Sequence, residues 1–156
     1  MTKEQLAVKK FMLKAGQKCP DKPTIPNLKT RKLRAKLILE EALETINKGL
    51  GIEAMLYLGR GDNDQRVRID DIVFVDNYKP DLVELADGLG DSPYVGYYGT
   101  ALACGIDMEP VFEEIQKSNM SKFIDGYKRK DGKWQKGLSF RPPEIASIIE
   151  KQKNEN

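Results

Sequence analysis

Two segments with helical periodicity carry two groups of carboxylates. The first segment, LRAKLILEEALETI, and the second, PDLVELADGLGD, contain Glu40, Glu41 and Glu44, and Glu84, Asp87 and Asp91, respectively. Hard divalent cations such as Mg²⁺ take oxygen ligands that converge from several directions. Two facing helices can present such ligands to one site. The pattern therefore predicts a fold built around a pair of helices with a cation between them.

The acids of the first segment interrupt an apolar stripe. At about 100° per residue, Glu40 and Glu44 lie nearly in line, and Glu41 is displaced by one step of that rotation. Leu33 and Leu37 fall in the same sector as the acids. A solvated helix face is the ordinary explanation of one acidic stripe, but such a face does not normally carry these leucines.

The second segment repeats this design. Glu84, Asp87 and Asp91 share a sector of roughly 60°, and Leu82 and Leu89 lie broadly opposite. Carboxylates buried together without a cation strongly destabilise a fold. Two such stripes together favour a metal site, whereas either stripe alone is weak support for one.

The composition excludes several classes of function. The 156 residues suffice for one domain with a core. A net charge of +2 argues against binding to nucleic-acid polymers or membrane surfaces. The absence of histidine excludes histidine bases and nearly all catalytic zinc sites. Cys19 and Cys104 indicate reduced thiols, and no apolar run reaches 18 residues, so a cytoplasmic protein is expected.

A basic segment follows the acidic part of the chain. Between Lys117 and Lys136 it contains seven lysine and arginine residues: Lys117, Lys122, Lys128, Arg129, Lys130, Lys133 and Lys136. Such a segment beside an acidic metal site suits a polyphosphate ligand. A solvated turn over residues 128–133 is the alternative, and the sequence leaves both open.

Periodicity and breakers predict the remaining elements. Helices are expected over residues 3–15, 31–48, 81–104 (kinked at Pro93) and 107–118, with a last one from Pro142 to about Gln152. We expect an extended connector over residues 16–30 and a loop over 59–64. Residues 52–58 are expected to extend the preceding helix or to start a new one. A short hairpin or irregular insertion is expected over 67–77, and a loop or tight hairpin over 126–141. Close helix packing is the favoured reason for Gly96 and Gly99, while packing and ligand space both stay open for Gly88 and Gly90.

The acidic motifs resemble those of the all-α nucleoside triphosphate pyrophosphohydrolases, the MazG-like and phosphoribosyl-ATP pyrophosphohydrolase superfamily. Members carry Glu-Glu-x-x-Glu, a spacer and Glu-x-x-Asp, which match residues 40–44 and 84–87 here. The spacer looks longer than usual, and residues 59–78 account for the difference. The stretches ADGLGDSPYVGYYGTALACGID, SNMSK, GKWQKG and FRPPEI also resemble the family, so the likeness extends from Val8 to Ile149.

The resemblance implies a fold and a reaction. The fold is an all-α, MazG-like bundle of about four to five helices with a short irregular or hairpin insertion, assembled as a homodimer or a dimer of dimers. We expect one domain over residues 1–156, with a metal-binding helical core at 31–125 and a basic loop and C-terminal helix at 126–156. The reaction is Mg²⁺-dependent hydrolysis of a nucleoside triphosphate to the monophosphate and diphosphate, in nucleotide-pool housekeeping.

The resemblance also implies roles for single residues. The ligands of Mg²⁺, or of Mn²⁺, are Glu40, Glu44, Glu84 and Asp87. Glu41 orients or deprotonates the attacking water, and Asp91 is an additional ligand or a partner of Lys122. The residues expected to contact substrate are Asn119, Lys122, Lys133, Lys136 and Tyr94. Alternatively, Asn119 only forms part of a helix-terminating turn. For Trp134, a structural role is favoured over stacking on a base.

Two other interpretations remain. The first is phosphoribosyl-ATP hydrolysis in histidine biosynthesis. The second belongs to another class, a non-catalytic helical dimer that serves as an interaction module and in which the acids only pair with lysine and arginine.

Overall fold

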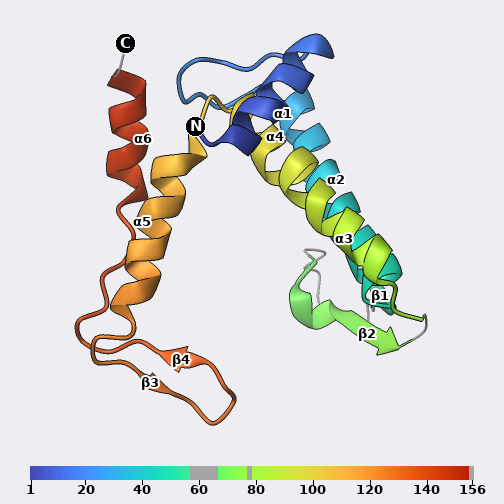
Figure 1. The fold of residues 1–156 in the computed structure, drawn as a ribbon, viewed down its shortest axis with the longest axis vertical. Coiled ribbons are helices and arrows are strands. Elements are labelled where there is room, and N and C mark those ends of the chain that lie inside the picture. The colour runs from blue at the N-terminus through green and yellow to red at the C-terminus, as the bar shows by residue number, and fades with distance from the viewer. Residues whose placement is uncertain (57–66, 77–78, 155–156) are drawn as a thin grey trace. The chain divides into compact units, whose positions relative to one another are not determined.

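The computed structural model describes residues 1–56, 67–76 and 79–154, and these form two compact units (Figure 1). One unit comprises residues 27–100, and the other comprises residues 1–26 with 101–156. Helices dominate both units, and the strands form only two small two-stranded sheets, so the all-α prediction is confirmed. The prediction of a single domain over 1–156 stays a prediction.

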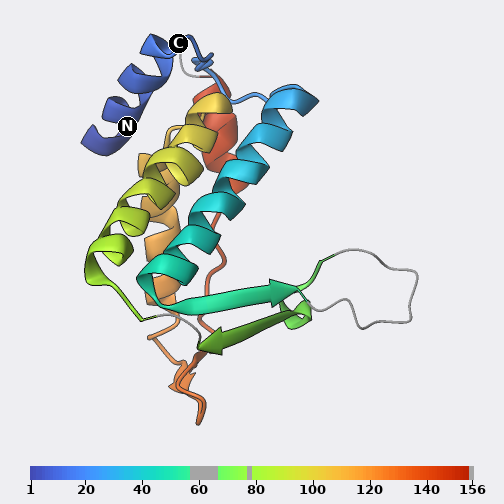
Figure 2. The same ribbon diagram turned by 90° about the vertical axis from the view of Figure 1, so that its right-hand side faces the viewer.

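Two long antiparallel helical rods make up most of the unit 27–100 (Figure 2). α2 (Leu28–Glu44) begins after Asn27, whose side chain accepts a hydrogen bond from the Thr30 amide at 2.9 Å, and continues into a π-helical turn, Thr45–Gly49. α3 (Leu82–Asp91) is capped by Asp81 and continues through a π-helical segment, Ser92–Tyr98, into α4 (Gly99–Ala103). Pro93, which was expected to kink this rod, lies near the start of that π-helical segment.

A β-hairpin connects the two rods. β1 (Ile52–Leu56) pairs antiparallel with β2 (Ile72–Asp76), in a register that places Ala54 opposite Phe74. A hairpin insertion is thus confirmed, but residues 67–77, where it was expected, supply only one of its strands after a 3-10 turn, Ile69–Asp71. The other strand falls within residues 52–58, where the expected helix is wrong over 52–56. Gly51, at φ 69°, ends the helical path, and β2 supplies the backbone partners that a short apolar run needs to form a strand. The loop expected at 59–64 lies outside the described residues.

The rods pack through a line of close contacts, which we call the seam. Its contact pairs are Gly49 with Leu85, Thr45 with Gly88, Ile38 with Gly96, and Arg34 with Gly99. Residue numbers fall along one helix as they rise along the other, as antiparallel packing requires. The close-packing prediction is confirmed for Gly99, because Arg34 Nη1 lies 2.8 Å from where its Cβ atom would be. At Gly96 the nearest atom, in Ile38, lies 3.6 Å from that point, which is an ordinary van der Waals contact that leaves room for a Cβ.

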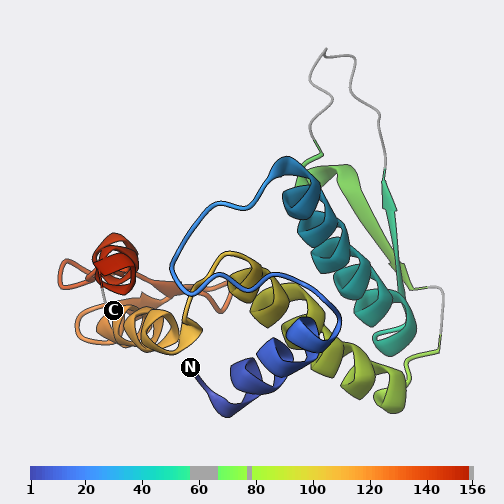
Figure 3. The same ribbon diagram turned by 90° about the horizontal axis from the view of Figure 1, so that it is seen from above.

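The other unit has a small apolar core. It combines α1 (Lys3–Lys14), α5 (Met108–Ser121), α6 (Ile145–Asn154) and a short hairpin of β3 (Tyr127–Lys128) and β4 (Trp134–Gln135). α5 and α6 lie side by side (Figure 3). Among the residues that the structure describes, those that are both buried and apolar belong to this unit: Val8, Met12, Ala101, Leu102, Ala103 and Val111.

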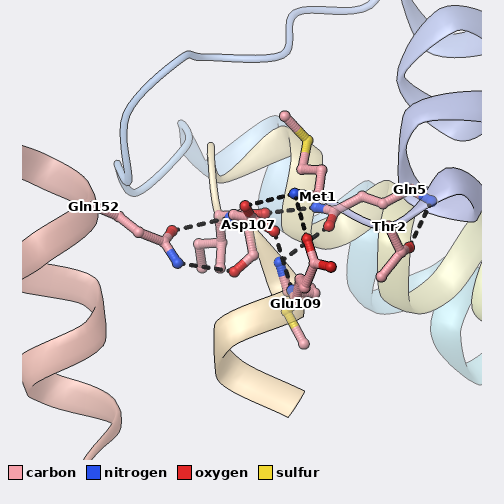
Figure 4. Close-up of polar contacts among 8 residues, drawn as sticks. Met1, Thr2, Gln5, Asp107, Glu109 and Gln152 are labelled. Carbon is pink, nitrogen blue, oxygen red and sulfur yellow. Dashed lines mark hydrogen bonds and ion pairs between the residues drawn. The ribbon is translucent and has the colours of Figure 1, made fainter. Parts of the chain in front are cut away.

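Two glutamines hold the turn that precedes α5 (Figure 4). The buried Gln5 side chain donates to the Ile106 carbonyl at 2.7 Å and accepts from the Met108 amide at 3.0 Å. Gln152, from α6, accepts from the Asp107 amide at 3.0 Å and donates to the Asp107 carbonyl at 2.9 Å. The two side-chain oxygens thus accept from the Asp107 and Met108 amides, which a helix start leaves unpaired.

Candidate active site

Glu41 lies on the seam between the two rods. It falls one helical turn from both Ile38 and Thr45, which contact the second rod, so the same side of α2 faces that rod. Glu41 is half-buried, whereas Glu40, Glu44, Glu84, Asp87 and Asp91 are exposed. Glu41, which the sequence analysis set apart because it is rotated away from Glu40 and Glu44, is therefore the acid nearest the contact between the rods.

The remaining acids share one side of the rod pair. Glu40 and Glu44 each precede a seam position of α2 by one residue, and Glu84 and Asp87 each precede the seam residues Leu85 and Gly88. A one-residue step turns a helix by about 100°. Because the two rods are antiparallel, side chains one residue before a seam position lie on the same side of the pair in both rods. We call this side, with Asp91, the acidic face.

Electrostatics agree with this arrangement. Burial is the largest cause of the raised pKa of Glu41, followed by the charges of Asp91, Glu44, Glu40 and Asp87. Asp91 and Asp87 belong to the second rod, so its acids reach the neighbourhood of Glu41. Among these four charges, that of Asp91 raises the pKa of Glu41 most. The sequence analysis gave Asp91 only an additional role and did not predict this.

Lys48 completes the acidic face and was missed by the sequence analysis. It follows Glu44 by one turn and forms an ion pair with that carboxylate. The hydrogen bond to Glu44 is the largest cause of the raised pKa of Lys48, and the charges of Glu44, Glu84 and Asp87 add to it. The i,i+4 spacing from Glu44 was the signal available in the sequence.

The donor set fits a hard divalent cation. All the candidate ligands are carboxylates, the group that Mg²⁺ and Mn²⁺ prefer. Burial first, and then the charges of the neighbouring acids, raise the pKa of Glu41 beside them. Among residues 1–56, 67–76 and 79–154, no three acidic or cysteine side chains converge closely enough to hold an ion. The ligand assignment therefore stays a prediction.

The candidate substrate contacts divide between the units. Tyr94 is half-buried in the π-helical segment of the unit 27–100. The end of α5 brings two of the others together, because Lys122 Nζ donates to Asn119 Oδ1 at 2.7 Å. Lys133 lies before β4, where its amide donates to the Asp131 carboxylate at 3.1 Å.

Lys136 and Lys122 lie near the same aromatic ring, that of Phe140, a residue to which the sequence analysis gave no role. The Lys136 ammonium lies 4.1 Å from the centre of the Phe140 ring, and the Lys122 ammonium lies 5.9 Å from the same point. Trp134 has the structural role that was favoured for it, since its indole donates to the Lys122 carbonyl at 2.7 Å and its ring centre lies 4.8 Å from that of Phe123.

Comparison with known proteins gives one family. The family model described as phosphoribosyl-ATP pyrophosphohydrolase matches residues 8–119, which is most of the chain. The matched range includes the acidic face and Asn119. A comparison with curated proteins finds no match. No helix within the described ranges has both the length and the apolar character to cross a membrane.

Proposed function

Because the chain belongs to the phosphoribosyl-ATP pyrophosphohydrolase family, we propose that it hydrolyses a nucleoside triphosphate to the monophosphate and diphosphate. The supporting observation is the acidic face, on which two helices present carboxylates on either side of the half-buried Glu41. A cytoplasmic role in nucleotide-pool housekeeping accords with this activity.

The proposed chemistry assigns the metal to the exposed acids. Glu40, Glu44, Glu84 and Asp87 would hold Mg²⁺ or Mn²⁺, with Asp91 beside them. The ion supplies neutralisation of the triphosphate charge and alignment of the leaving diphosphate.

Glu41 is proposed as the general base. Its raised pKa makes its carboxylate a stronger base than an ordinary glutamate. The carboxylate takes a proton from water as the water oxygen bonds to the α phosphorus. The bond from that phosphorus to the oxygen bridging to the β phosphorus breaks, and its electrons leave with diphosphate. Histidine is absent from the chain, so a carboxylate suits this task.

The substrate contacts are proposed for the other unit and for Tyr94. Lys122, Lys133 and Lys136 would contact phosphate oxygens, since ammonium groups bind phosphate as point charges. Asn119 can both donate and accept, which suits a base edge or a ribose. Tyr94 would stack on the base.

We further propose that the chain works as a homodimer or a dimer of dimers. Large apolar side chains on both rods are exposed, among them Leu39, Leu82 and Leu89, which are 58%, 82% and 59% accessible. A second copy would cover them.

A diphosphate-release assay tests the proposed reaction. The protein, with Mg²⁺, is offered the common nucleoside and deoxynucleoside triphosphates and, in parallel, phosphoribosyl-ATP. Release from a triphosphate supports the proposal. Selective release from phosphoribosyl-ATP supports the second candidate, which fits the family description equally well. No release from any substrate, together with a melting temperature unaffected by Mg²⁺, would instead support a non-catalytic interaction module.

A further inference from the structure

We propose that Phe140 is a positioning residue that gathers the Lys122 and Lys136 ammonium groups into one binding site for a condensed phosphate. This inference rests on the proposed function, because it names the part of the protein that takes the polyphosphate end of the substrate. It adds a residue with no ionisable group, to which neither the acidic motifs nor the expected substrate contacts assign a role, although Phe140 opens the FRPPEI stretch.

The two ammonium groups converge on one aromatic ring. Lys136 Nζ is 4.1 Å and Lys122 Nζ is 5.9 Å from the ring centre, both within the range in which an ammonium is attracted to an aromatic face. The nitrogen atoms are therefore no farther apart than the sum of these distances. One di- or triphosphate can contact both across such a gap.

The ring is held in place by the surrounding backbone. The segment from β4 to Arg141 is joined to residues 121–125, at the end of α5, by three hydrogen-bonded links. Trp134 donates to the Lys122 carbonyl at 2.7 Å, Ser139 donates to the Asp125 carboxylate from its amide at 2.9 Å and its hydroxyl at 3.0 Å, and the Arg141 amide donates to Ser121 Oγ at 2.9 Å. Phe140 lies between the last two links, so its position relative to Lys122 is fixed by the fold.

The segments joined here carry the two lysines and the Asp125 carboxylate, which accepts from Ser139. Neither Lys122 nor Lys136 forms an ion pair within the described part of the chain, and the Asn119 amide oxygen is the acceptor for Lys122. Two like charges near one ring repel each other. A polyanion would remove that repulsion and satisfy both ammonium groups, which favours a condensed phosphate over a neutral ligand.

The test measures binding without hydrolysis. Inorganic tripolyphosphate is titrated calorimetrically into the full chain without divalent cations, for the wild type, Phe140→Leu and Phe140→Tyr. The loss of two exposed cation–ring contacts should weaken binding by about three- to tenfold in Phe140→Leu. Phe140→Tyr keeps an aromatic face and should stay within about twofold of wild type. Phe112→Leu, which makes the same substitution at an exposed phenylalanine of α5, is the control.

A double-mutant cycle separates positioning from folding. Lys136→Gln should weaken tripolyphosphate binding more in the wild-type background than in Phe140→Leu, because the ring no longer places the lysine. Additive effects, equal losses in Phe140→Leu and Phe112→Leu, or a wild type that does not bind tripolyphosphate would each overturn the inference. Binding that depends on Phe140 in a protein that hydrolyses no nucleotide would uphold this site and reject the proposed reaction.

Discussion

Glu41 combines partial burial with the charges of its acidic neighbours. We predict that Glu41→Gln lowers nucleotide hydrolysis by about 10²- to 10⁴-fold, the usual contribution of a general base. The same change should raise the melting temperature of the metal-free protein, because one of several crowded like charges is removed. Diphosphate release and thermal melts measure the two effects. Glu113→Gln, an exposed glutamate of α5, is the control and should change neither.

Lys48 should weaken metal binding, because its ammonium already pairs with Glu44 and lies in the field of Glu84 and Asp87. Lys48→Gln is predicted to tighten Mg²⁺ binding by about three- to tenfold, given the repulsion between a fixed positive charge and a divalent ion a few ångströms away. Calorimetric titration of Mg²⁺ measures the change.

Lys32→Gln is the matched control for Lys48, since it removes an exposed lysine of the same rod that lies about two turns from the nearest acid, Glu40. Equal Mg²⁺ affinities for wild type and Lys48→Gln would show that Lys48 does not compete with the ion.

At the residue scale, angular position along a helix set Glu41 apart from its neighbours, and the structure finds Glu41 half-buried and the other five acids exposed. Roles that depend on contacts across the fold could not be predicted in this way. The pairing of Lys48 with Glu44 follows from i,i+4 spacing, but the added charges of Glu84 and Asp87 come from another helix, and two lysines from different elements meet at the Phe140 ring. Neither of the last two relations is visible in local spacing.

At the scale of elements, two glycines of α3 provide an internal comparison. A Cβ at Gly88 would collide with Thr45, whereas one at Gly90 would meet nothing within 4 Å. Gly88→Ala should destabilise the protein by about 1–3 kcal/mol through overpacking. Gly90→Ala should stabilise it by up to about 1 kcal/mol, because alanine is the better helix former. Chemical denaturation measures both.

Thr45 provides the control for this comparison. Thr45→Ala in the Gly88→Ala background should recover part of the lost stability, since it removes the hydroxyl that the new Cβ meets. A Gly90→Ala protein that loses stability would mean that another surface approaches this face of α3. That finding would answer the question that the sequence left open for Gly90.

Helices were predictable where apolar periodicity coincides with a capping residue. Asn27, Asp81 and Asp107 each cap a helix that the sequence predicted. β1 was not predictable as a strand, because a short apolar run such as IEAMLYL suits a helix equally well. Its state depends on pairing with β2, which lies many residues later in the chain.

At the scale of the whole molecule, the rod pair has two unlike sides. The acidic face lies on one side, and an apolar face lies on the other. The apolar residues either follow a seam position by one residue or lie one helical turn from a residue that does. They are Leu39, Ala42 and Ile46 on the first rod, and Leu82, Ala86, Leu89, Pro93 and Tyr97 on the second. Such an exposed apolar surface is typical of a protein interface.

The apolar face predicts self-association through these helices. We expect a solution mass of at least twice the 17.7 kDa of one chain, measured by light scattering or sedimentation. Leu82→Glu places a charge on the apolar face and should shift the mass towards the monomer, because burying an unpaired charge is costly. Leu138→Glu alters a fully exposed leucine in the other unit and should leave the assembly intact. A monomeric wild type would contradict this prediction while leaving the proposed chemistry of the acidic face open to its own test, because the acids occupy the opposite side of the helices.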